Sequence, residues 1–78
     1  MDEKLTFRYD RVGDILHVET RPPYAEQESE GLGDEVVARL NPSTGDIEGL
    51  EVLFFSTRLL RGEHFDVPLR VSLRPAQT

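Results

Sequence analysis

His17 and Glu19 stand two residues apart in the stretch "YDRVGDILHVET", with Arg8 just upstream. Side chains two apart on a β-strand project from the same face, and a histidine oriented by a carboxylate is a proton-transfer arrangement. Arg8 falls beside them if the two neighbouring apolar runs pair as a hairpin. The three residues therefore form a candidate ligand-binding face. Since no serine, cysteine or lysine accompanies them as a nucleophile in this pairing, a polar outer face or a dimer contact is the alternative interpretation.

Two aspartates, Asp10 and Asp14, bracket the polar break "DRVGD" between those runs. A calcium site needs more oxygen ligands than this break provides. Aspartate side chains accept backbone N–H bonds in tight turns. We expect both aspartates to turn the chain.

A second candidate set, Arg39, Glu51 and Phe55, points to an interaction surface. Glu51 lies among apolar neighbours. If its face is solvated, Glu51 is an ordinary surface residue, whereas if a second copy covers that face, Glu51 needs a partner such as Arg39 on the adjacent strand. Phe55, like the other phenylalanines near it, is typical of a core or dimer contact rather than a ligand cage.

Metal and cofactor chemistry find little support in the sequence. His64 and Asp66 repeat the spacing of His17 and Glu19, and His64 with His17 could in principle form a two-histidine metal site, but nothing in the spacing requires it. There is no glycine-rich phosphate loop, no G-x-S-x-G and no H-E-x-x-H. We predict no catalytic residue, no metal and no cofactor.

Strands are predicted wherever apolar and polar residues alternate, which happens at 4–9, 15–20, 35–40 and 47–54. Pairing Tyr9 with Leu16 places apolar pairs on one face and polar pairs on the other, with Leu16 and Val18 pointing inward and His17 and Glu19 outward. In the fourth run Ile47 is out of phase with the residues after it, and a β-bulge at or near Gly49 would restore one face.

The rest of the chain predicts one helix, one loop and one more strand. Ser56 is a plausible helix N-cap and Gly62 a C-cap glycine, enclosing about two turns. Residues 21–33 lack periodicity and read as a loop, whereas 67–74 alternate cleanly, as a strand that begins at Pro68 or lies on an edge. The fold class is α+β: one domain over 1–78, a small, mostly antiparallel sheet of four to five strands (two β-hairpins plus a C-terminal strand), with one short helix across one face.

Size and charge limit the classes of function. A chain of 78 residues buries a modest share of its surface, and without cysteine the supplement we expect first is self-association, with a dimer favoured. The net charge of −6 argues against direct binding to nucleic acid and favours a basic protein partner. With no signal peptide and no apolar run of membrane-spanning length, we expect a cytoplasmic location and no membrane contact.

Two segments, "YDRVGDILHV" and "EVVARLNPSTGDIEGLEVL", resemble the small bacterial family known as domain of unknown function 2283, over about residues 6–56. Members of this family typically read Y-D-x-x-x-D-x-L-Y-I, followed by a turn that ends in glycine and by an I-x-G-I-E-I-L strand. The residues of this chain that match the pattern are Tyr9, Asp10, Asp14, Leu16, Val18, Gly45, Ile47, Gly49, Leu50, Glu51, Val52 and Leu53. His17 departs from it where tyrosine is usual, and Arg39 where an acidic residue is common. The resemblance implies a β-rich fold with no established activity, and an antitoxin-like role for some members. The strand at 67–74 is an addition, and a swapped strand at a dimer interface is one use for it.

The sequence therefore favours a non-enzymatic interaction domain that self-associates and binds a protein partner, with an antitoxin as the sharpest form of this hypothesis. The alternative is a small-ligand-binding protein or enzyme that uses the face of Arg8, His17 and Glu19.

Overall fold

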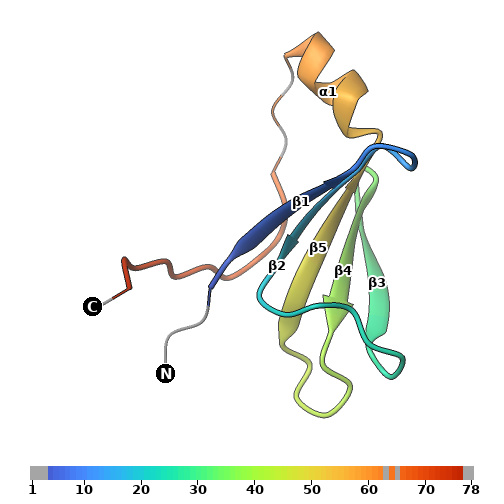
Figure 1. The fold of residues 1–78 in the computed structure, drawn as a ribbon. Coiled ribbons are helices and arrows are strands. Elements are labelled where there is room, and N and C mark those ends of the chain that lie inside the picture. Colours follow the sequence, from blue (N-terminus) through green and yellow to red (C-terminus); the bar gives the residue numbers. More distant parts are fainter. Residues whose placement is uncertain (1–3, 63, 65, 77–78) are drawn as a thin grey trace.

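The computed structural model describes residues 4–62, 64 and 66–76. It is an α+β fold, a five-stranded antiparallel sheet followed by one short helix (Figure 1). The strands are β1 (Thr6–Asp10), β2 (Ile15–Glu19), β3 (Glu28–Gly33), β4 (Val36–Leu40) and β5 (Ile47–Leu53), and the helix is α1 (Phe55–Arg61). Their order across the sheet is β1-β2-β5-β4-β3. The predicted fold class is confirmed.

Both predicted hairpins form. In the first, Tyr9 lies opposite Leu16 and Arg8 opposite His17, which is the predicted pairing. In the second, Arg39 pairs with Gly49 but Leu40 pairs with Ile47, so Glu48 is an extra residue on β5. The bulge predicted near Gly49 is therefore confirmed.

The fifth strand comes from a segment that we expected to be a loop. Residues 28–33 form β3, an edge strand that pairs along one side with β4. Its sequence, ESEGLG, is rich in residues that are depleted in strands. The segment forms a strand because it pairs with β4 across the tight turn at Asp34 and Glu35, both of which have a positive φ. The prediction of one continuous loop over 21–33 is wrong for this half.

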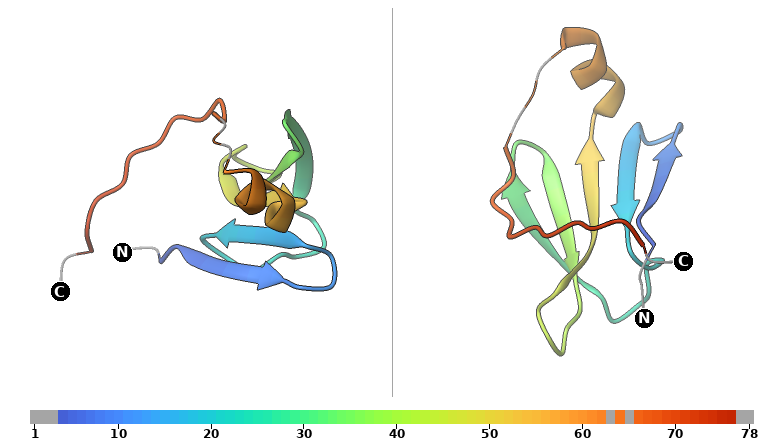
Figure 2. Two further views of the ribbon diagram at one scale, coloured as in Figure 1. Left: turned by 90° about the horizontal axis from the view of Figure 1, so that it is seen from above. Right: turned by 90° about the vertical axis from the view of Figure 1, so that its left-hand side faces the viewer.

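The strand predicted at 67–74 is absent, and this prediction is wrong. Residues 66–76, hereafter the C-terminal segment, carry no secondary structure. Seen from the side, the segment runs across several strands instead of alongside one (Figure 2). A strand has to lie along a sheet edge to form ladder hydrogen bonds, so its alternating sequence is not enough.

The helix lies beyond one end of the sheet, where we had expected it across a face (Figure 1). Its N-cap is Phe54, with φ of 54°, and not Ser56 as predicted. Gly62 ends it in the left-handed conformation, φ 66°, with its N–H directed to the carbonyl groups of Arg58 and Leu59, so the predicted C-cap is confirmed. Arg58 fastens the helix to the sheet by donating to the carbonyl groups of Leu53 and Asp34.

The paired positions form rows across the sheet that divide its two faces. One face, called the apolar face below, carries Phe7, Tyr9, Leu16, Val18, Val36, Ala38, Leu40, Ile47, Leu50 and Val52. The other carries Arg8, His17, Glu19, Arg39 and Glu51, called the charge network below. Among the described residues the buried apolar side chains are few, namely Val36, Ala38 and Val52.

Candidate functional site

The charge network brings both predicted residue sets together on one face of four strands. Arg8 lies opposite His17, and His17 lies opposite Glu51, so β1, β2 and β5 place these side chains in one row. Glu19 and Arg39 both lie opposite Gly49 on β5 and form the next row. Phe55, the remaining predicted residue, is elsewhere, at the start of α1.

The charges of this network are paired within the chain. Glu19 Oε1 accepts from Arg8 Nη2 at 3.2 Å and from Arg39 Nη2 at 3.1 Å. Arg39 Nη1 lies 3.7 Å from Glu51 Oε2, so the partner that the sequence suggested for Glu51 is beside it. Two arginines and two glutamates balance in charge, which lowers the cost of their burial.

Gly49 makes the contact between Arg39 and Glu19 possible. The two side chains come from β4 and β2, with β5 between them. A Cβ atom at Gly49 would lie 3.2 Å from Arg39 Nη2 and 3.4 Å from the Glu19 Cβ. The glycine therefore leaves space for the guanidinium group to cross β5.

His17 is held neutral by its surroundings. Burial lowers the pKa of His17, and the positive charge of Arg8 lowers it further, against the opposing effect of Glu51. Arg39 Nη2 lies 3.4 Å from His17 Nδ1. The same ring nitrogen lies 3.5 Å from Glu51 Oε2, so Nδ1 is placed between a donor and an acceptor of the charge network.

The prediction that His17 and Glu19 point outward to a solvated face is wrong. They are only 7% and 6% exposed. Arg8 and Arg39 contact Glu19, and Val36, Ala38 and Val52 are buried on the apolar face, so buried side chains lie on both faces of the sheet. A ligand-binding role for Arg8, His17 and Glu19 stays a prediction, as does a partner-binding role for Arg39 and Glu51. Within the chain these residues form paired charges, with Arg39 Nε left as a buried donor that has no hydrogen-bond partner among the described residues.

The two aspartates of the first hairpin have different tasks. Asp10 Oδ1 accepts from the backbone N–H groups of Val12 and Gly13, which closes the turn as predicted. Asp14, with φ of 58°, instead accepts from the hydroxyl and the backbone N–H of Ser56, at 2.7 and 2.9 Å. Asp14 therefore anchors the first turn of α1 from another element.

Tyr9 completes this anchor. Its hydroxyl donates to Asp14 Oδ1 at 2.5 Å, and its ring centroid lies 6.0 Å from that of Phe55. The donors from Tyr9 and Ser56 lower the pKa of Asp14, and the carboxylate raises the pKa of Tyr9. The interaction role predicted for Phe55 stays a prediction, and within the chain its ring is half-buried against Tyr9.

Glu48, the bulge residue, was missed by the sequence analysis. Its carboxylate accepts from the Tyr24 hydroxyl at 2.5 Å and from the side chains of Arg21, Gln27 and Asn41 at 3.3, 3.1 and 3.2 Å. These donors, led by Tyr24, lower the pKa of Glu48 to about 2. The carboxylate ties the segment before β3 to β5. The sequence did contain a signal for Glu48. The apolar alternation changes phase between Ile47 and Leu50, which indicates a bulge, and a bulge turns the side chain of the extra residue in a new direction.

Metal binding has no support in the part of the chain that the structure describes, which holds no group of three or more His, Asp or Glu placed to bind an ion. His64 and Asp66 are exposed and lie beyond α1. The described helix is too short and too polar to cross a membrane.

Comparisons of this chain with protein-family models, with curated proteins and with solved structures return no match. The resemblance to domain of unknown function 2283 therefore stays a prediction from the residues that carry it.

Proposed function

We propose that this protein is a non-enzymatic interaction domain whose first partner is a second copy of itself, bound through the apolar face. The observation that carries the proposal is the exposed part of the apolar face. Val36, Ala38 and Val52 at its centre are buried, but Phe7, Tyr9 and Ile47 on the same face are 66%, 43% and 38% exposed. Exposed apolar patches of this kind are typical of protein–protein contact sites.

The surface area supports the same proposal. A folded monomer of 8.9 kDa is expected to expose about 4,800 Å², whereas this chain exposes 6290 Å². The excess is larger than the roughly 800 Å² that each partner contributes to a standard interface. A single copy therefore leaves enough surface uncovered for a stable dimer.

Analytical ultracentrifugation from low to high micromolar concentration tests self-association. We expect a dimer, and we expect Phe7→Ser to weaken it by about 100-fold or more, because burial of each phenylalanine contributes about 1.5–3 kcal/mol and a two-fold dimer loses two. The matched control is Val12→Ser, since Val12 is fully exposed on the hairpin turn. A wild-type protein that stays monomeric at the highest concentration contradicts the proposal.

The second part of the proposal is a basic protein partner, with an antitoxin-like role as its sharpest form. It is supported by the net charge of −6 and by exposed Glu28 and Glu30 on β3. β3 is an edge strand, and a free edge accepts an extended segment of another chain.

Affinity purification from the native host at low salt tests this part. We expect one basic protein with the wild-type chain and with the control Asp46→Lys, which alters an exposed acidic residue away from β3. The double variant Glu28→Lys/Glu30→Lys should lose it. Recovery of the same protein with that variant would rule out the β3 edge.

A further inference from the structure

The C-terminal segment has an apolar side that its own chain does not fully use. Val67 and Leu69 are half-buried, but Val71 is 65% and Leu73 76% exposed. Among the described residues of this segment the backbone makes one hydrogen bond, from Leu69 N–H to the Val67 carbonyl. The segment therefore has the alternating apolar residues of a packed strand, but its last two apolar side chains, Val71 and Leu73, are not packed against the chain.

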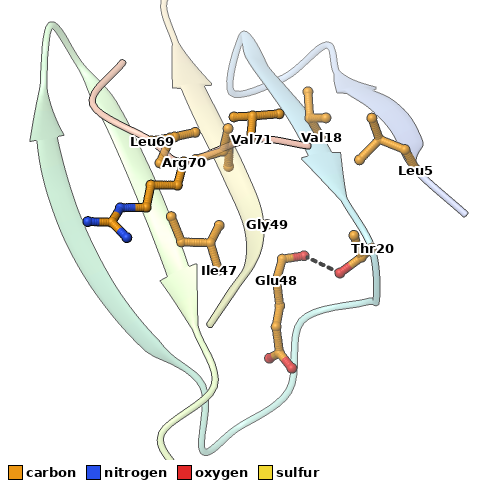
Figure 3. Close-up of a pocket in the computed structure, with 10 residues that line it drawn as sticks. Leu5, Val18, Thr20, Ile47, Glu48, Gly49, Leu69, Arg70 and Val71 are labelled. Atoms are coloured by element: carbon orange, nitrogen blue, oxygen red, sulfur yellow. Dashed lines mark hydrogen bonds between the residues drawn. The ribbon is translucent and has the colours of Figure 1, made fainter. Parts of the chain in front are cut away.

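An open cavity of about 180 Å³ lies between the C-terminal segment and the apolar face. Leu69 and Val71 line it from the segment, Val18 and Ile47 from the sheet, and Leu5 from the residues before β1 (Figure 3). The segment thus lies over the apolar face without filling the space between them.

The segment also starts from a position that favours exchange. It follows a helix that lies beyond the end of the sheet, as the side views show (Figure 2), and that ends at the left-handed Gly62. Leu59 and Leu60 of the helix are exposed. From there a segment of this length can cross its own sheet or that of a neighbouring copy.

The dimensions agree with an open arrangement. The radius of gyration is 13.3 Å, whereas a packed domain of this length is expected near about 11.5 Å. In an exchanged dimer the contacts that half-bury Val67 and Leu69 form between chains, which is why exchange is a low-cost route to dimers, and the second copy supplies the further contacts that Val71 and Leu73 lack. The surplus surface described above would then be enclosed between two sheets and two segments.

We infer that two copies exchange their C-terminal segments, so that residues 66–76 of each copy cover the apolar face of the other. This inference rests on the proposed self-association and names the element that closes the interface. Val71 and Leu73 would then be buried in the dimer.

The absence of cysteine from the chain permits a clean cross-linking test. The double variant Ile47→Cys/Val71→Cys places one thiol on each side of the cavity. After oxidation at a concentration where the protein is dimeric, non-reducing electrophoresis separates a disulfide within one chain from disulfides between two. The control pair is Ile47→Cys/Val12→Cys, with Val12 on the turn between β1 and β2. A second pair, Leu5→Cys/Leu69→Cys, repeats the test in case the first variant does not fold.

Exchange predicts a covalent dimer from both cavity pairs and none from the control pair. It also predicts a mixed disulfide when the single variants Ile47→Cys and Val71→Cys are combined. A disulfide confined to one chain, in a protein that still sediments as a dimer, would overturn the exchange and leave the proposed function standing. A monomeric wild-type protein would overturn both.

Discussion

Replacement of Arg39 by methionine is the most direct test of the charge network as a structural element. Methionine keeps most of the apolar stem but removes the contacts to Glu19 Oε1 at 3.1 Å, His17 Nδ1 at 3.4 Å and Glu51 Oε2 at 3.7 Å. Breaking a buried ion pair by removing one partner costs about 3–5 kcal/mol. We expect about 2–3 kcal/mol here, because Arg8 still pairs with Glu19 and because Glu51 is partly exposed.

Urea unfolding followed by circular dichroism, at one fixed protein concentration, measures this loss. With a slope of about 1 kcal/mol per molar urea for so small a domain, the midpoint should fall by about 2–3 M. The matched control is Arg11→Met, at an exposed arginine in the turn between β1 and β2, which should change stability by no more than about 0.5 kcal/mol. Equal midpoints for the two variants would refute a structural role for the network.

A double-mutant cycle and a titration add independent readouts. The double variant Arg39→Met/Glu19→Gln should lose less free energy of unfolding than the two single variants together. In each single variant one charge of the Arg39–Glu19 pair stays buried without the other, whereas the double variant removes both. Arg39 also helps to lower the pKa of His17. The His17 pKa measured by NMR should therefore rise in Arg39→Met.

Three further predictions concern pH dependence and helix anchoring. Folding lowers the His17 pKa, so neutral His17 contributes to the free energy of unfolding above its unfolded pKa of 6.5, and this contribution is lost as the pH falls through the folded pKa. Melting temperatures measured at several pH values should show this loss in the wild type and in the control His64→Gln. His17→Gln should not show it. Folding also lowers the Glu48 pKa, so its contribution is present above 4.5 and is lost as the pH falls toward about 2. The acid unfolding curve of Glu48→Gln should accordingly be flatter in that interval, and an unchanged curve would contradict the assignment. Asp14→Asn should lower the melting temperature and return the Tyr9 pKa toward 10.0, observed by phenolate absorbance; a Tyr9 titration that does not move would contradict the anchor.

Local pattern was sufficient for the β1–β2 and β4–β5 hairpins, whose strands alternate, but not for the β3–β4 pair. The alternation around Tyr9 and Leu16 predicts both strands and their pairing, because one shift of register would exchange the two faces. The phase slip before Gly49 predicts the bulge for the same reason. Gly62 ends the helix because it adopts a positive φ at no steric cost.

Local pattern was thus enough for the two predicted hairpins, the C-cap of the helix and the division of side chains between two faces. The tertiary structure determined the burial of His17, Glu19 and Arg39, since Glu19 and Arg39 meet across Gly49 through a strand order that no local pattern contains. It also decided that the glutamate-rich β3, and not the alternating run at 67–74, becomes the fifth strand. A strand needs an edge to pair with: β3 has one in β4, to which it is joined by the tight turn at Asp34 and Glu35, whereas residues 67–74 run across the strands and not along an edge (Figure 2).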